Sequence, residues 1–161
     1  MGDFINNQAA HNPIVIYQDG GGLVTKYQNA AMQYNLERRQ VKILGECRSA
    51  CILALSVKNV CVGPKAVVMA HMAYEKDTGI RRPDVTAQMI DTLPYRVKAH
   101  LEGHIEREYT PHTTMNYATL KSLGIKECVK DVYAKDEVSE NKNKRLHILN
   151  PLNLIGALLR R

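Results

Sequence analysis

Ser49 is the first candidate for chemistry, because it stands where an extended stretch gives way to an apolar run in GECRSACILAL. A serine at the start of a helix suits a nucleophile, since the N–H of Ala50 would lie at the positive helix end and could stabilise an oxyanion. The same position also suits an ordinary N-cap serine. Cys47 and Cys51 flank Ser49 and are the alternative working residues of this stretch.

A triple glycine, Gly20 to Gly22, is the second candidate and follows a β-branched run. A glycine loop between a strand and a helix can turn backbone N–H groups outward to hold an anion, either a phosphate or a transient oxyanion. The letters DGGGLV match neither GxGxxG nor a P-loop, which needs a Lys followed by Ser or Thr. A plain turn is the competing interpretation.

His71 is the third candidate and ends the strand-like run VVMAH. A general base needs an imidazole held at the edge of a packed sheet, within reach of the nucleophile. A core histidine with satisfied hydrogen bonds is the alternative. His100 and His104 share a helix face in HLEGH, but this is not HExxH and no third ligand is evident, so we expect two surface histidines and no metal.

The elements that must position these residues alternate between strand and helix patterns, which is typical of a layered α/β domain. Pro94 should kink or break a long helix that starts at Asp84 and runs to about Tyr109. Gly124 should end a short helix. The remaining expectations are strands at 14–17, 41–44, 60–62, 67–70 and 128–133, helices at 23–39, 49–57 and 117–123, and a turn at 45–48.

One α/β domain is expected over residues 13–133, preceded by a polar lead-in at 1–12. Residues 134–147 are charged and lack an apolar period, so they are expected to be a linker. Residues 148–161 are apolar with a basic end and too short to span a bilayer. They are expected to dock on the domain or a partner subunit, with a membrane surface as the second interpretation.

The composition limits the class of partner and the compartment. The chain of 161 residues carries a formal charge of +6 but few aromatics, so a specific nucleic-acid partner is not expected. Four cysteines match no zinc pattern, and buried free thiols are the default in a reducing compartment. The first residues show no signal-peptide pattern. The expected compartment is the cytoplasm for the chain as given, or an exported one if a signal segment has been removed.

The three candidates come in a fixed order that resembles the proteolytic subunit of the Clp protease and its crotonase-like relatives, over roughly residues 13–133. The form Cys-x-Ser-Ala-Cys resembles a branch of Clp-protease-like proteins often of exported type. The matching stretches are 21–23 (GGL), 45–50 (GECRSA), 68–71 (VMAH) and 122–125 (SLGI).

This resemblance implies a serine hydrolase, most naturally a peptidase, that needs no cofactor. Ser49 matches the acyl-enzyme nucleophile, His71 the general base, and the N–H groups of Gly22 and Ala50 the oxyanion hole. The family's third residue is usually an aspartate, but the matching stretch 112–116 (HTTMN) has no acidic residue. His112 and Asn116 are the candidates left for that place.

The missing aspartate and one further departure from the family pattern keep other functions open. The family usually carries a strand and a helix before the strand that leads into the glycine turn, but only twelve residues stand there in this chain. Either the fold is trimmed, a neighbouring subunit completes the sheet, or the chain is a fragment; because an uncovered sheet edge is costly, we expect a homo-oligomer. The cysteines become packing groups or a disulfide in an oxidising compartment, although a helical Cys47–Cys51 pair would need local distortion. A catalytically inactive assembly protein is the main alternative, and an acyl or nucleotide binder using the glycine loop is a third.

Overall fold

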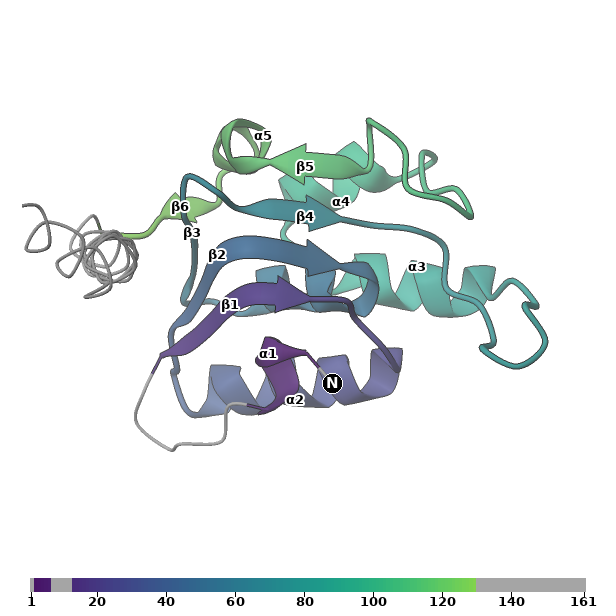
Figure 1. The fold of residues 1–161 in the computed structure, drawn as a ribbon, viewed down its shortest axis with the longest axis horizontal. Coiled ribbons are helices and arrows are strands. Elements are labelled where there is room, and N and C mark those ends of the chain that lie inside the picture. Colours follow the sequence, from purple (N-terminus) through teal and green to yellow (C-terminus); the bar gives the residue numbers. More distant parts are fainter. Residues whose placement is uncertain (1, 7–12, 130–161) are drawn as a thin grey trace, which may run out of the picture. The chain divides into compact units, whose positions relative to one another are not determined.

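A curled, mostly parallel sheet forms the centre of this computed structural model, which describes residues 2–6 and 13–129 (Figure 1). The long strand β2 (Val41–Arg48) pairs with β1 (Ile14–Asp19) along one side. On its other side its two halves pair with β3 (Val60–Val62) and β4 (Val67–Met69). All these pairings are parallel, so the expected α/β class is confirmed.

Two short strands complete the sheet. The strand β5 (Thr114–Asn116) runs antiparallel to β4, and β6 (Lys126–Glu127) runs parallel to β3. No strand was expected at β5, and the last strand was expected at 128–133 rather than at β6. Residues 130–133, the linker at 134–147 and the docking segment at 148–161 lie outside the described residues.

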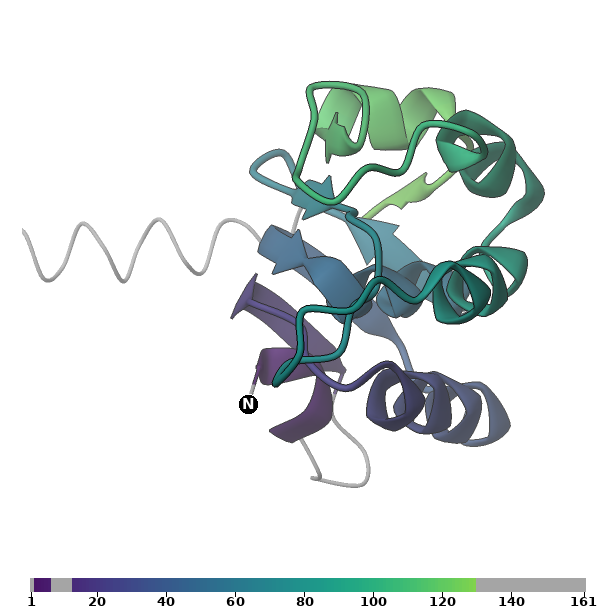
Figure 2. The same cartoon turned by 90° about the vertical axis from the view of Figure 1, so that its right-hand side faces the viewer.

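Helices pack on the sheet and bury its apolar side chains. The first long helix, α2 (Val24–Leu36), buries Tyr27, Ala31 and Tyr34, and Figure 2 shows it beside α3 (Pro83–Asp91). The helix expected from Asp84 to Tyr109 is broken at Pro94, as predicted, but α4 (Tyr95–Leu101) ends well before Tyr109. The short helix α5 (Tyr117–Ser122) stops before Gly124, which has a φ of +91°.

The turn expected at 45–48 is wrong, because β2 continues to Arg48. Pairing with β1 shifts there: Ile16 pairs with Ile43, but Gln18 pairs with Glu46, so β2 holds one extra residue. The extra residue marks a β-bulge. A Cβ atom on Gly45 would overlap the carbonyl of Tyr17, so the glycine that suggested a turn instead allows close approach of β1.

The stretch expected only as a polar lead-in contains a docked helix, α1 (Asp3–Asn6). Phe4 is fully buried against the rings of Tyr27 and Tyr34. The carboxylate of Asp3 accepts hydrogen bonds from the N–H groups of Tyr17 and Gln18 on β1. These bonds cover part of the outer edge of that strand.

Free thiols were the default expectation, but the structure pairs all four cysteines in two disulfides. One joins Cys61 on β3 to Cys128, just after β6, and so ties the end of the described domain to the sheet. The other joins Cys47 and Cys51.

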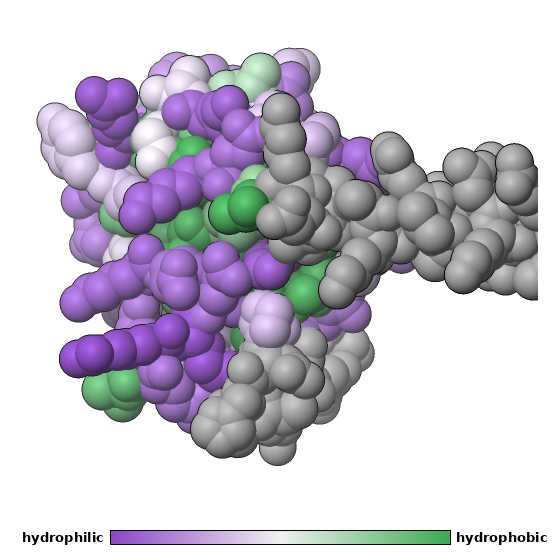
Figure 3. Space-filling view, turned by 90° about the vertical axis from the view of Figure 1, so that its left-hand side faces the viewer, coloured by the Kyte–Doolittle hydropathy of each residue, from purple (hydrophilic) through white to green (hydrophobic). Residues whose placement is uncertain are grey.

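On the face shown in Figure 3, the described residues form a mainly hydrophilic surface with apolar side chains in small patches between them. Among the helices of residues 2–6 and 13–129, none has the length and apolar character needed to cross a bilayer.

Candidate active site

Ser49 occupies a sharp elbow between β2 and the 3₁₀ helix η1 (Ser49–Ser56). Its φ is +55°, in the left-handed region that non-glycine residues rarely adopt, whereas Arg48 before it is extended. Such conformations cluster at functional sites, where the surrounding structure must hold them. The helix that follows is buried, but Ser49 itself is only partly buried and lines a cleft.

The Cys47–Cys51 disulfide brackets this elbow. Both cysteines are fully buried and their Cα atoms lie 5.3 Å apart, within the usual range for a disulfide. The expectation that local distortion would disfavour this pair is wrong, because Cys47 lies in a strand and only Cys51 lies in the helix. The disulfide fixes both ends of the elbow, and neither cysteine has a free thiol for nucleophilic chemistry.

The glycine loop packs directly against the elbow. Gly21 has a φ of +80°, and a Cβ atom there would lie 2.6 Å from the Arg48 carbonyl oxygen, 2.7 Å from Ser49 Cβ and 2.9 Å from Ala50 N. Only glycine fits this position. The first and second sequence candidates, which lie on different strand–helix connections, are therefore neighbours in space.

Two backbone N–H groups near this contact are suited to an oxyanion. Ala50 lies in the first turn of η1, where N–H groups have no partner within the helix. Gly22 is exposed, lines the cleft and directly follows Gly21, whose own N–H is bonded to Asp19. Ala50 is buried and is not among the residues that line the cleft, and its methyl side chain has no polar group, so it can contribute only its backbone N–H.

His71 follows β4 and lines the same cleft as Ser49 and Gly22. Its Nδ1 atom lies 2.9 Å from the carbonyl oxygen of Met72. A carbonyl only accepts, so Nδ1 carries the proton and Nε2 keeps the lone pair, which is the tautomer that a general base needs. Tyr109 packs edge-on against the imidazole, with 4.9 Å between ring centroids.

The surroundings of His71 also favour its neutral form. Burial lowers the pKa of this imidazole below its ordinary value, against weaker opposing effects of the Met72 carbonyl and the Glu108 carboxylate. A neutral imidazole can accept a proton at neutral pH.

The cleft has a volume of about 990 Å³. Val85 and Met89 of α3 supply apolar lining, while residues of the 74–82 segment supply charges of both signs. The lining comprises Gly20, Gly21, Gly22, Leu23, Val24, Thr25, Ser49, His71, Ala73, Tyr74, Glu75, Lys76, Asp77, Thr78, Arg82, Val85, Met89 and Tyr109.

The two candidates for a third catalytic residue make other contacts. The ring of His112 stacks on His100 and lies tilted against His104, and its Nε2 lies 2.7 Å from the His100 carbonyl oxygen. Asn116 accepts a hydrogen bond from Thr119 N and caps α5. Neither side chain lines the cleft. Within the described part of the chain, no group of three or more His, Cys, Asp or Glu side chains is arranged to hold a metal ion.

Two groups at this site were missed from the sequence. The Met72 carbonyl orients His71, and no residue pattern marks a backbone acceptor. Asp19 is 1% exposed and binds the N–H of Gly21. An aspartate at the end of a strand and directly before three glycines is the signal that could have found it.

No protein-family model matches the chain, and a search of curated proteins finds no significant match.

Proposed function

We propose that this chain is a serine hydrolase of peptide or protein substrates, with Ser49 as nucleophile and His71 as general base. The observation that carries the proposal is the contact between Gly21 and the Ser49 elbow, in a cleft that His71 also lines. Ser49, Gly22 and His71 all line this cleft, which supports a site where a hydroxyl, a backbone N–H group and an imidazole act on one acyl carbon.

In this proposal the Ser49 hydroxyl oxygen attacks the substrate carbonyl while Nε2 of His71 takes its proton. The N–H groups of Gly22 and Ala50 donate to the oxyanion that forms. His71 then protonates the leaving amine, and water attacks the acyl-enzyme with His71 again acting as base.

The Met72 carbonyl has part of the role that an aspartate has in a catalytic triad. It sets the tautomer of His71, but a neutral carbonyl stabilises the imidazolium less than a carboxylate does. We therefore expect slower turnover than from a triad with an aspartate.

A peptide fits the cleft better than a compact small molecule. The volume of the cleft, about 990 Å³, lies at the upper end of the range for small-molecule pockets. Apolar side chains from α3 and charges from the 74–82 segment offer separate sites for neighbouring side chains of an extended peptide.

The proposal extends to the Clp-protease-like and crotonase-like fold. Support comes from the order of elements: a strand and glycine loop before α2, a strand and serine elbow before η1, and a strand that ends before His71. The two disulfides favour an oxidising compartment, so we propose export rather than the cytoplasm.

Self-association of the chain belongs to the same proposal. The strand β1 pairs only with β2 among the described strands, and an edge strand is a common site for assembly. Sedimentation velocity checks this: an oligomer is the expected result, and a monomer at micromolar concentration would contradict it.

Labelling with a fluorophosphonate probe tests the proposed function. The wild type should be labelled, and Ser49→Ala should abolish labelling. Ser56→Ala is the matched control, because Ser56 ends the same helix and its hydroxyl donates to the Leu53 carbonyl instead of facing the cleft. Labelling that persists in Ser49→Ala would refute the role of Ser49.

A catalytically inactive assembly protein is the second candidate. One observation favours it: His71 has a carbonyl rather than a carboxylate on Nδ1. This alternative predicts that folded wild-type protein is not labelled and that Ser49→Ala changes no biological role.

A further inference from the structure

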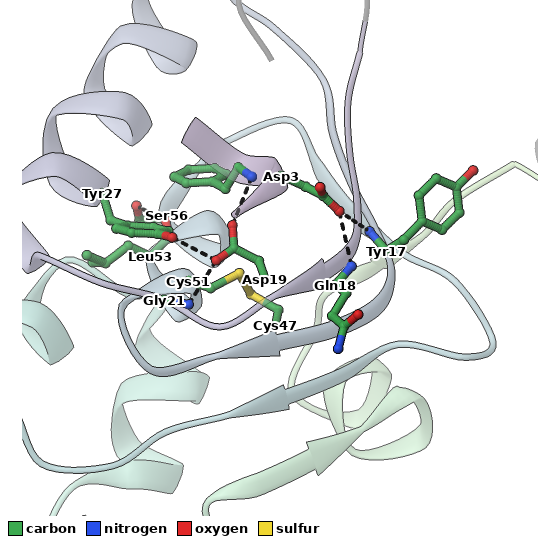
Figure 4. The surroundings of a disulfide bond; sticks show 11 residues. Asp3, Tyr17, Gln18, Asp19, Gly21, Tyr27, Cys47, Cys51, Leu53 and Ser56 are labelled. Atoms are coloured by element: carbon green, nitrogen blue, oxygen red, sulfur yellow. Dashed lines mark hydrogen bonds between the residues drawn. A yellow bond between two sulfur atoms is a disulfide. The ribbon is translucent and has the colours of Figure 1, made fainter. Parts of the chain in front are cut away.

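The carboxylate of Asp19 is the most deeply buried acidic group near the cleft, with 1% of the residue exposed. It ends β1 and pairs in register with Cys47 of the bracketed elbow. Figure 4 shows it between the glycine loop, α2 and the disulfide. A buried carboxylate is costly unless hydrogen-bond donors replace its lost water.

Three donors from three parts of the chain satisfy this carboxylate. Oδ1 accepts from Gly21 N at 2.9 Å and from the Tyr27 hydroxyl at 2.7 Å, and Oδ2 accepts from Phe4 N at 2.9 Å. Burial and the neighbouring Asp19 carboxylate both raise the pKa of the Tyr27 hydroxyl, so it stays protonated and remains a donor.

The donor to Oδ2 belongs to residues 2–6, which we name the N-terminal clip. The ring of Phe4 stacks on Tyr27, and the Phe4 carbonyl accepts a 2.6 Å hydrogen bond from the Tyr34 hydroxyl. Gly2 lies so close that a Cβ atom there would overlap the Asp19 carboxylate. The clip therefore covers Asp19 and supplies one of its donors.

We infer that Asp19 is a positioning residue, which the N-terminal clip holds in place so that it fixes the Gly21 amide and thereby the oxyanion-binding loop beside Ser49. The inference rests on the proposed function. Gly21 links Asp19 directly to the elbow, since its N–H donates to Asp19 and its Cα packs against Ser49 and Ala50. Losing the clip would leave Asp19 Oδ2 without its hydrogen-bond donor, so the Asp19 carboxylate would hold the Gly21 amide less firmly.

Two variants test the inference by different routes. Asp19→Asn replaces one acceptor oxygen by an NH₂ group, so at least one of the three donors then faces another donor. In Gly2→Val the added side chain would overlap the Asp19 carboxylate and so displace the clip. This variant substitutes neither Asp19 nor Gly21 nor Ser49. Asp3→Asn is the matched control, because both β1 donors bind one oxygen of Asp3, and the amide oxygen of asparagine can still accept both bonds and keep the clip docked.

The measurements are kcat and KM for a peptide substrate and the affinity for a peptide boronic acid. The concentration of active serine, determined by fluorophosphonate titration, is used to calculate kcat. Asp19→Asn and Gly2→Val should lower kcat about ten- to hundredfold and weaken the boronate similarly, with KM within about twofold, because an oxyanion donor acts mainly on the transition state. Asp3→Asn should keep the wild-type values.

The outcomes separate the two proposals. If the wild type turns over substrate but both variants match Asp3→Asn per active serine, the inference fails and the proposed function stands. If the wild type is neither labelled nor active, the proposed function fails and the inference fails with it. Should Asp19→Asn not fold, Gly2→Val alone decides.

Discussion

Replacing Gly21 by alanine tests the contact on which the site depends. A left-handed φ costs a non-glycine residue about 1–2 kcal/mol. The new Cβ would also lie 2.6–2.9 Å from atoms of the elbow, well below ordinary contact distances of 3.4–4 Å, and such overpacking costs about 1–3 kcal/mol. Together these effects predict a loss of about 2–5 kcal/mol in the free energy of unfolding.

The shortest contact must lengthen by about 0.8 Å, from 2.6 Å to 3.4 Å, so the glycine loop must withdraw from the elbow. A misplacement of about 1 Å can cost about 10²-fold in rate, so kcat/KM should fall about ten- to hundredfold. Denaturant unfolding and steady-state peptide hydrolysis measure the two effects.

Gly20→Ala is the control for this substitution, because an added Cβ at Gly20 meets nothing within 4 Å and its φ is not left-handed. It should change neither quantity much. Equal kcat/KM values for Gly20→Ala and Gly21→Ala would refute the claim that this contact positions the catalytic groups.

Burial lowers the pKa of His71 below 6.5, the ordinary value for histidine, so the pH profile of kcat/KM should reach half its plateau below pH 6.5. A midpoint above pH 6.5 would contradict a neutral, buried base. Replacing both Cys61 and Cys128 by serine opens a loop that spans 67 positions and should cost about 4 kcal/mol of unfolding free energy, measured by denaturant titration; an unchanged midpoint would contradict it. Asn116→Ala should remove the α5 cap at a cost of about 1 kcal/mol without changing kcat, whereas a thousandfold fall in kcat would restore Asn116 as a third catalytic residue.

Much of the fold could be predicted where the local pattern and the tertiary environment agree. The strand at 14–17 and the helix starting near residue 23 were predictable from a β-branched run and from apolar residues on one helix face. Pro94 marked a helix break for a covalent reason, because its ring has no N–H to donate.

The errors lie where long-range contacts decide local structure. The strand β5 exists because it pairs with β4, and its residues Thr, Met and Asn have no strand pattern of their own. From the sequence alone, Gly45 is typical of a turn. The β1 backbone that needs a glycine there is distant in the sequence, so this close approach could not be predicted.

In the candidate site, some residues could likewise be predicted from the sequence and others could not. Ser49, His71 and the glycine loop could be named from residue types and order. Their partners could not, because the Met72 carbonyl is a backbone atom and Asp19 depends on the docking of the N-terminal clip.

A crystal structure with a bound peptide boronic acid would show whether Ser49, His71 and the two amides surround one reacting centre. We expect boron bonded to the hydroxyl oxygen of Ser49, with a boronate oxygen about 2.7–3.1 Å from the backbone nitrogens of Gly22 and Ala50. Nε2 of His71 should lie within hydrogen-bond distance of the adduct. An adduct on another residue, or a boronate oxygen that points away from both amides, would rule out Ser49 as nucleophile or Gly22 and Ala50 as oxyanion donors.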